Sequence, residues 1–210
     1  MRAIAKQISC IYTIYRTEEQ RDKPLTLDSR TYMRTYTMIF DYCVTTKTAS
    51  KDGSSTVPTI EDLYRSSERE TKNRCVLVRE IIFILTTDVI DNNKALQEIL
   101  ARYNFQWQRY TQATQLVRNL MQFVERHWIR RVIDEKRKDI HLIRDLHDKI
   151  WREQVLQVDT RSATTELRNG QLVDAVRIIQ EQGKERTDRD EELIDTFVNS
   201  LATLDIALDT

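Results

Sequence analysis

The chain has 210 residues, with 33 basic and 33 acidic side chains and therefore no formal net charge. Three glycines and two prolines are few for this length, and 31% of the residues are charged. Sheets need many turns, and turns use glycine and proline, so the composition predicts an all-α protein of one or two domains built from long helices. Because the opposite charges are balanced and mixed along the chain, no net field attracts nucleic acid or an anionic membrane.

The cysteines and the apolar stretches indicate the kind of cellular compartment in which the protein is expected. Cys10, Cys43 and Cys75 are widely spaced and form neither a redox motif nor a metal-binding pattern, so we expect reduced thiols in an intracellular protein. The first residues lack the apolar core of a signal peptide, and no stretch reaches the roughly 18 apolar residues of a membrane span. The most apolar window, residues 76–85, includes two charged residues and predicts a buried helix.

The N-terminal part predicts a short amphipathic helix and then a longer one. Ile4, Ile8 and Ile11 repeat at helical spacing before a charged stretch interrupts the pattern. Asp28 is the expected N-cap of a helix over residues 29–46, because its carboxylate can accept a hydrogen bond from a free backbone amide.

The helix over residues 29–46 has an unusually wide apolar band. Aromatic and methionine side chains are favoured at protein–protein contacts, because they bury a large area at a modest cost in entropy. The helix is therefore either fully enclosed by its own domain or offers a docking face. The band consists of one stripe with Tyr32, Tyr36, Ile39 and Cys43, and a neighbouring stripe with Met33, Phe40 and Val44.

A polar segment and a new helix follow. Residues 45–58 are small and polar and include one glycine and one proline, so we predict a flexible surface loop. Residues 59–62 (TIED) are typical of a capping box that begins a helix. The next turns, residues 65–74, contain no large apolar residue, so we expect either a solvated segment at one end of a bundle or a helix that starts late.

Residues 106–157 have the clearest helical periodicity and contain no glycine or proline. Their apolar stripes predict two long helices joined near Asp134, where a charged run breaks the pattern. The first helix also carries a second row that contains Phe123 and His127. Its apolar surface is therefore wider than one packing partner would cover. This surplus is either core or a docking face. The first stripe is Ala113, Val117, Leu120, Val124 and Trp128, the second row is Leu116, Leu120, Phe123 and His127, and the later stripe is Ile140, Ile143, Leu146 and Ile150.

The last part of the chain predicts two more amphipathic helices, over residues 172–179 and 193–206. A polar segment precedes the first of them, and a charged turn at residues 183–188 separates the two. Amphipathic helices joined by short links are typical of units that stack and bury their apolar faces against one another.

Several of these segments resemble the N-terminal region of the cullins, the elongated helical scaffolds of multisubunit ubiquitin ligases. RHWIRR at residues 126–131, with WQRY before it and Trp151-Arg152 after it, resembles the branch that uses Skp-type adaptors. TYMRTYTMIFDYC resembles the second helix of that family, and Leu63-Tyr64 resembles its LY pair. The resemblance implies elongated stacked helical bundles, in which residues 1–157 form a first cullin-repeat-like unit and residues 158–210 begin a second.

The resemblance also implies a binding surface. In such cullins the second helix and the helix that carries Phe123 form the adaptor-docking surface. The family often has glutamate and leucine after the methionine, whereas this chain has Arg34-Thr35, a departure that could weaken or retune adaptor choice. Carried over position by position, the adaptor-binding residues are Tyr32, Met33, Tyr36, Phe40 and Phe123.

In function, the resemblance implies a non-catalytic scaffold subunit of a cullin-RING-type ubiquitin ligase in the cytoplasm and nucleus. Its N-terminal arm is expected to bind a Skp-type adaptor and thereby an F-box-type substrate receptor for ubiquitin-dependent degradation. Full-length relatives bind a RING protein and a ubiquitin-like modifier at their far end, to which no part of residues 1–210 corresponds. A RING subunit is therefore expected only if the chain continues. A chain complete as given would bind an adaptor without recruiting a conjugating enzyme.

No motif predicts chemistry of the chain's own, so we expect no cofactor and no metal. His141 and His147 are six residues apart on a helix and cannot share a metal ion, and His127 is expected to be structural. The basic cluster within residues 126–144 could grip phosphates, but the acids among these charges weaken that attraction. Nucleic-acid binding is therefore a minor alternative. The main alternative is a helical scaffold or tethering protein of another class, whose apolar stripes are entirely internal.

Overall fold

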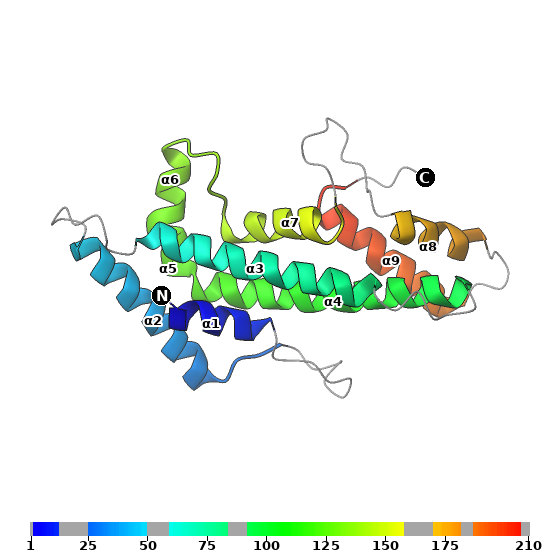
Figure 1. The fold of residues 1–210 in the computed structure, drawn as a ribbon, viewed down its shortest axis with the longest axis horizontal. Coiled ribbons are helices and arrows are strands. Elements are labelled where there is room, and N and C mark those ends of the chain that lie inside the picture. Colours follow the sequence, from blue (N-terminus) through cyan, green and yellow to red (C-terminus); the bar gives the residue numbers. More distant parts are fainter. Residues whose placement is uncertain are drawn as a thin grey trace. The chain divides into compact units, whose positions relative to one another are not determined.

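The architecture is all-α, as predicted (Figure 1): every regular element in the described parts of the chain is a helix. None of these helices is long and apolar enough to cross a membrane. The computed structural model describes residues 2–12, 25–49, 59–83, 92–157, 170–181 and 187–206.

The helices follow one another along the chain in the order labelled in Figure 1. Between two of the longer ones the chain forms a short helix, a π-helix and a further short helix in succession. The elements are α1 (Arg2–Ile11), α2 (Ser29–Ala49), α3 (Ile60–Phe83), α4 (Asn92–Leu120), α5 (Gln122–Val124), the π-helix η3 (Glu125–Ile129), α6 (Arg130–Asp134), α7 (Ile143–Gln154), α8 (Gly170–Glu181) and α9 (Asp188–Thr203).

The described residues divide into two compact units. Unit 1 draws on Met1–Arg74 and Arg109–His147, and unit 2 draws on Cys75–Gln108 and Asp148–Thr210. Helices α3, α4 and α7 each contribute residues to both units. The predicted junction after residue 157 remains a prediction, because residues 158–169 lie outside the described ranges.

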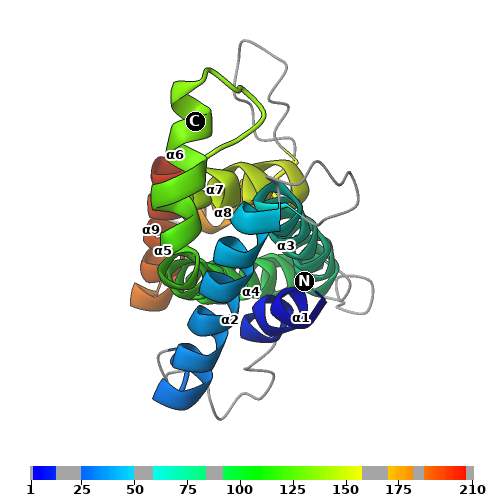
Figure 2. The ribbon, with the colours of Figure 1, turned by 90° about the vertical axis from the view of Figure 1, so that its left-hand side faces the viewer.

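Both predicted stripes of residues 106–157 are buried, and the predicted break near Asp134 is present. The first long helix is interrupted, however. Helix α4 ends at Leu120, and after Met121 the chain continues as α5, η3 and α6. This segment bends steeply away from α4 (Figures 1 and 2). At its end, Lys136 adopts a left-handed conformation, with φ of 65°. The Lys136 and Arg137 amides then donate back to the Ile133 and Val132 carbonyls, which satisfies the last turn.

One face of the polar segment of α3 is buried, which corrects the expectation for residues 65–74. The helix begins at Ile60, so it does not start late, and Ser67 and Thr71 are buried rather than solvated. The Thr71 hydroxyl donates to the Ser67 carbonyl at 3.0 Å, so its polar group is satisfied inside the helix. Small side chains suit this position because other elements of unit 1 supply bulky rings to it.

The rings that face this part of α3 come from three elements of unit 1. Tyr12 follows α1, Tyr110 is on α4 and His147 is on α7, and all three side chains are buried. The Tyr12 ring centroid lies 6.1 Å from that of Tyr110 and 6.2 Å from that of His147. The Tyr12 hydroxyl also lies 3.3 Å from the hydroxyl of Thr71. Aromatic bulk on α1, α4 and α7 thus fills the space that larger apolar residues on α3 would occupy.

His147 is held neutral in this cluster. Its Nδ1 lies 2.6 Å from the Ile143 carbonyl oxygen, which can only accept, so Nδ1 carries the proton. Nε2 therefore accepts from the Tyr12 hydroxyl, 2.5 Å away. Burial lowers the pKa of His147 to about 4, because the charged imidazolium would lose its hydration.

The Tyr64 side chain anchors the loop between α6 and α7. Its hydroxyl donates to the His141 carbonyl at 3.1 Å and accepts from the His141 amide at 3.0 Å. The ring packs 5.7 Å from that of Trp128, and burial raises the pKa of Tyr64 to about 12. Tyr64 belongs to the LY pair noted in the sequence, and Trp128 belongs to RHWIRR, so these two sequence signatures meet in the core of unit 1.

The predicted helix caps are present. The Asp28 carboxylate accepts from the Thr31 amide at 2.9 Å, which caps α2 and lowers the pKa of Asp28. At the start of α3, the Thr59 amide donates to Asp62 at 2.6 Å and the Asp62 amide donates to the Thr59 hydroxyl at 3.2 Å. These reciprocal bonds form the expected capping box.

Two predicted boundaries were wrong. Residues 45–49 continue α2 instead of beginning a loop, because the Thr45 and Thr46 hydroxyls donate to carbonyls one turn back and so remain satisfied in a helix. The rest of the predicted loop, residues 50–58, lies outside the described ranges. The last helix begins at Asp188, earlier than its apolar residues suggested, since Thr187 and Asp190 form a second capping box.

Unit 2 has its own aromatic core, built on Tyr103. The Tyr103 hydroxyl lies 3.0 Å from that of Ser200 on α9 and accepts from the Trp151 indole at 3.3 Å. Burial raises the pKa of Tyr103 to about 12.

Leu77 and Ile81 on α3 are exposed, contrary to the predicted burial of residues 76–85. They share one face of the helix, whereas Val78 and Ile82, the residues that follow them on the neighbouring face, are buried.

Candidate protein-docking site

The wide apolar band of α2 is divided between core and solvent. Ile39 and Cys43 are buried, as is Thr35, which lies one turn before Ile39. Met33 is 57% exposed, Phe40 39% and Val44 41%. The stripe with Ile39 thus faces unit 1, and the stripe with Met33 faces outward.

Tyr32 and Tyr36 precede Ile39 and Cys43 on the same side of α2. Both are half-buried, and their rings stack with centroids 6.5 Å apart and planes 12° apart. Helical spacing places them on the predicted stripe with Ile39 and Cys43, but of these four residues only Ile39 and Cys43 are fully buried. Here they can contribute one side of each ring to a partner while the other side packs on its neighbour.

The structure brings Phe40 and Phe123 together across two helices. Their ring centroids are 4.9 Å apart and the planes meet at 70°, an edge-to-face contact. Phe123, on α5, also packs against the exposed His127 of η3 with centroids 4.4 Å apart. Figure 2 shows α2 lying alongside the α5 segment. We call Met33, Phe40, Val44 and Phe123 the α2–α5 surface.

Bonds at both ends of α2 fix the orientation of this surface. Ahead of the helix, the Leu25 amide donates to the Gln112 side chain of α4 at 2.9 Å. In the later turns, the Tyr42 hydroxyl donates to the Thr59 carbonyl at 3.0 Å, at the start of α3. With α2 held to α4 and α3, its buried stripe cannot rotate outward without breaking these bonds.

The irregular stretch after α4 keeps Phe123 at the surface. Met121, Val124, Trp128 and Ile129 are buried around it, while Phe123 is half-buried. Glu125, also buried, accepts from the Ile143 amide at 3.4 Å and so satisfies a free donor at the start of α7. Single-turn π-helices occur frequently at functional sites. Here the π-helix η3 follows directly after α5, which carries the half-buried Phe123 ring.

The family model described as the cullin alpha solenoid domain matches residues 6–209. The chain belongs to the cullin family. This match confirms the resemblance that RHWIRR and TYMRTYTMIFDYC carried, and the all-α architecture agrees with it.

Individual cullins are similar over a little more than half of the chain. Cullin-1 of Dictyostelium discoideum is 28% identical over 120 residues, which is 56% of this chain and 15% of that protein. Cullin-1 of Caenorhabditis elegans is 24% identical over 127 residues, and Cullin-6 of the same organism is 22% identical over 126 residues. The aligned stretch covers 16% of each of these two proteins, so the chain corresponds to a small part of its curated cullin relatives.

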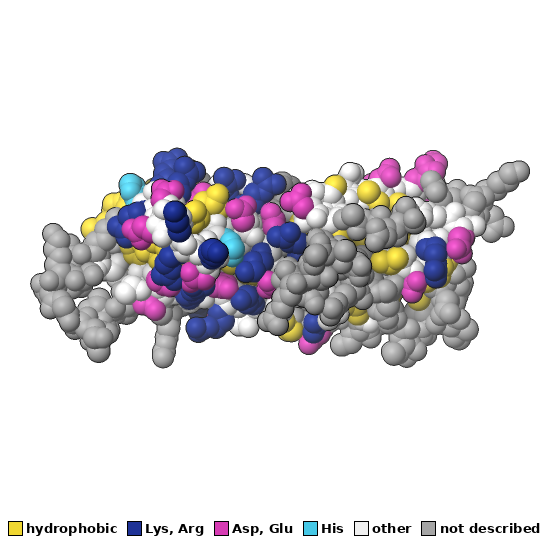
Figure 3. All heavy atoms as spheres, turned by 90° about the horizontal axis from the view of Figure 1, so that it is seen from above, with side chains coloured by type: hydrophobic (Ala, Val, Ile, Leu, Met, Phe, Trp, Pro, Cys, Tyr) yellow, Lys and Arg dark blue, Asp and Glu magenta, His cyan; other side chains and the backbone are white. Residues whose placement is uncertain are grey.

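Most charges in the loop of the cullin chain after α6 are paired. Arg137 lies 2.8 Å from Glu61 and 2.6 Å from Asp139, and Arg65 also pairs with Asp139. These contacts raise the pKa of Arg137 and hold that of Asp139 well below its usual range. Figure 3 shows the same mixture, with basic and acidic side chains interspersed over the face that carries α6 and the start of α7. This arrangement supports the predicted structural role of these arginines.

The arginines around the α2–α5 surface, in contrast, are not paired with acids in the described parts of the chain. Arg30 and Arg34 on α2 are exposed, as are Arg126 on η3 and Arg130 on α6. None of these four guanidinium groups has an ion-pair partner among the described residues. The apolar surface of this cullin is therefore flanked on both helices by uncompensated positive charge.

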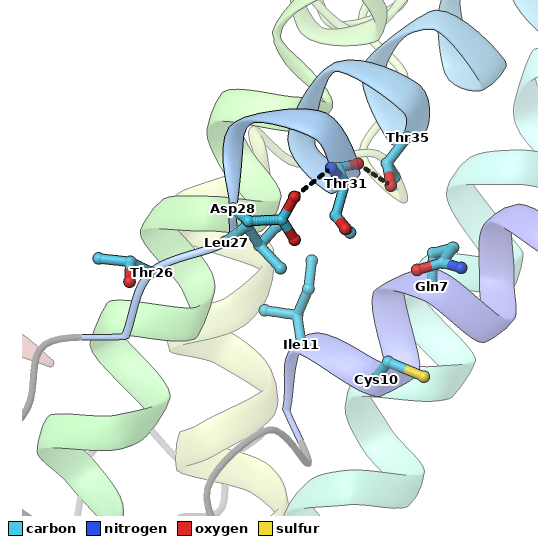
Figure 4. A pocket seen from close by; sticks show the side chains of 8 residues that line it. All are labelled: Gln7, Cys10, Ile11, Thr26, Leu27, Asp28, Thr31 and Thr35. Carbon is cyan, nitrogen blue, oxygen red and sulfur yellow. Dashed lines mark hydrogen bonds between the residues drawn. The ribbon is translucent and has the colours of Figure 1, made fainter. Parts of the chain in front are cut away.

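A pocket of about 280 Å³ lies between α1 and the beginning of α2 (Figure 4). Two of its polar side chains bond within the start of α2: Asp28 accepts from the Thr31 amide, and the Thr35 hydroxyl donates to the Thr31 carbonyl at 2.8 Å. Across the ranges that the structure describes, no group of three His, Cys, Asp or Glu side chains could hold a metal ion. The features of this cullin chain that point to a partner are therefore apolar and basic, and they lie on α2 and α5–α6.

Proposed function

We propose that the α2–α5 surface binds a Skp-type adaptor, and through it an F-box-type substrate receptor. The chain then serves as the non-catalytic N-terminal arm of a cullin-RING-type ubiquitin ligase scaffold in the cytoplasm and nucleus. The observation that carries this proposal is the contact between the exposed Phe40 and the half-buried Phe123, which joins two helices into one apolar surface. A RING subunit belongs to the proposal only for a chain that continues past Thr210.

The energetics of such a surface favour a protein partner. Covering an exposed Phe or Met side chain is worth about 1.5–3 kcal/mol when the burial is complete. Aromatic anchors near the centre of an interface carry most of the binding free energy, and the residues around them exclude water. Phe40 and Phe123 already pack edge to face, so little side-chain entropy is lost when a partner covers them.

The test is the affinity of the chain for a purified Skp-type adaptor, measured by calorimetry. We expect Phe40→Ala and Met33→Ala each to raise Kd about tenfold, since this corresponds to losing roughly 1.4 kcal/mol of contact. Leu77→Ala is the matched control, because Leu77 is 50% exposed on α3 but belongs to unit 2. Its Kd should equal that of the unsubstituted chain.

The outcome separates the adaptor proposal from the main alternative. If the unsubstituted chain is helical by circular dichroism but does not bind any Skp-type adaptor, the adaptor proposal is wrong. A scaffold or tether of another class is then the better interpretation. If Leu77→Ala weakens binding as much as Phe40→Ala does, the adaptor binds elsewhere.

A further inference from the structure

The arginines beside the α2–α5 surface are arranged in a way that the isolated chain does not explain. Arg30 and Arg34 are one turn apart at the beginning of α2, on either side of Met33 in sequence, and both are exposed. On the neighbouring helical stretch, Arg126 and Arg130 follow Phe123. None of them contributes an ion pair to the described part of unit 1.

Positive charge is unfavourable at the start of a helix. The amino-terminal end of the helix dipole is positive, and like charges four residues apart repel, so both effects destabilise arginines at this place. Helices α3, α7 and α9 have acids in the first turn, whereas the first turn of α2 contains none and holds Arg30 instead; α4 also lacks an acid there.

The acidic residues in and just before α2 do not neutralise the charges of Arg30 and Arg34. Asp28 uses its carboxylate to cap the helix through the Thr31 amide. Asp41 is exposed two turns after Arg34 and has no ion pair among the described residues. The start of α2 therefore keeps an excess of positive charge directly beside the exposed Met33.

We infer that the adaptor bound by this chain has carboxylates around an apolar centre, and that Arg34, assisted by Arg30, pairs with them. The inference rests on the proposed adaptor binding and names the chemistry of the partner. An adaptor with basic groups opposite Arg34 is repelled by its exposed guanidinium, whereas one with carboxylates there is attracted. Arg34 is thus a specificity-determining residue: it selects among adaptors that the apolar rings alone would bind alike.

Charges at the rim and rings at the centre of an interface affect different rate constants. Rim charges steer the approach of the partner and change the association rate constant, and salt screens their effect. Apolar anchors act after docking and mainly change the dissociation rate constant. The contribution of Arg34 can therefore be measured separately from that of Phe40.

The experiment measures association and dissociation of a purified Skp-type adaptor by stopped-flow fluorescence at several salt concentrations. At low salt, the double variant Arg30→Glu/Arg34→Glu should lower the association rate constant about tenfold or more, and the difference should shrink at high salt, where the Debye length falls to about 3 Å. Phe40→Ala should raise the dissociation rate constant instead. Arg189→Glu is the control, because Arg189 is exposed at the second position of α9 in unit 2, as Arg30 is in α2.

The outcomes are distinguishable. If Phe40→Ala weakens binding while the double variant associates as fast as the unsubstituted chain, or faster, the inference is overturned and the proposed function stands. If the unsubstituted chain binds no Skp-type adaptor, both fall. A purified adaptor in which the facing carboxylates are replaced by lysine should associate faster with the double variant than with the unsubstituted chain. Preference for the unsubstituted chain would contradict the pairing.

Discussion

At the scale of single residues, the buried polar groups of unit 1 are more informative than its apolar ones. Tyr12, Thr71, Tyr110 and His147 come from four elements, and each has a hydrogen-bond partner inside the core. Such a cluster holds its elements in one arrangement, since displacement of any member leaves a buried group unpaired. The sequence did not indicate it, because Tyr12 and His147 are separated by 135 positions.

His147 should make stability depend on pH. Its pKa is about 4 in the folded chain, below the ordinary value of 6.5. The unfolded chain therefore binds the extra proton between these values, so stability is fully present above pH 6.5 and is lost as the pH falls towards 4. The loss should approach about 3 kcal/mol.

Urea unfolding at a series of pH values measures this effect. The informative quantity is the difference between the unsubstituted chain and His147→Gln, because acids of the surface contribute equally to both. The two curves should converge as the pH falls from 6.5 to 4. Parallel curves over this range would mean that His147 is protonated in the folded chain.

At the scale of elements, the caps determine where helices begin. Thr59 and Asp62 cap α3, and Thr187 and Asp190 cap α9, each pair with reciprocal bonds. We expect Thr59→Ala and Thr187→Ala each to lower the free energy of unfolding by about 1 kcal/mol, since each removes the acceptor for a free backbone amide. Chemical denaturation measures the loss.

The serine variants are the controls for this prediction. Thr59→Ser and Thr187→Ser keep the hydroxyl and should retain most of the stability. Because the two boxes belong to different units, the double alanine variant should lose the sum of the single losses. A marked departure from additivity would indicate that the caps are coupled.

Local patterns predicted the elements better than their contacts. The stripes of residues 106–157 and the caps at Asp28 and Thr59 depend on neighbours within a turn or two, and they were predicted correctly. The contact between Phe40 and Phe123 depends on the bend at Met121 and on η3, which no spacing rule revealed. The adaptor-binding residues came from the family resemblance, and their role in binding remains a prediction.

Burial was also predicted wrongly for residues whose environment is set by elements far away in the sequence. The small residues of α3 suggested a solvated segment, but rings from α1, α4 and α7 cover Ser67 and Thr71. In the other direction, the apolar character of Leu77 and Ile81 suggested burial, whereas the helix turns both outward. Hydrophobicity predicts that a side chain prefers the core, but the partner elements determine whether a core is present at that position.

At the scale of the whole molecule, the cullin match extends over both units, whereas the proposed docking residues all belong to unit 1. Adaptor binding should therefore protect one part of the chain selectively. We expect amide exchange in α2 and in Phe123–His127 to slow when a Skp-type adaptor is added, because covered helices open less often. Exchange in α9, within unit 2, should not change.

Hydrogen exchange followed by mass spectrometry resolves these segments. The chain with Phe40→Ala provides the reference, since at equal adaptor concentration it should show less protection in α2. Uniform protection of both units would point to a partner that binds over a much larger area than the α2–α5 surface.

The cysteines differ in access: Cys10 is exposed beside the pocket at the start of α2, while Cys43 and Cys75 are buried. A maleimide dye added to the native protein would consequently attach at a single known position, without any engineered thiol. Fluorescence from that position would report on the surroundings of α1 and α2 in real time. Residues 1–210 thus already carry an attachment point for a sensor of complex formation.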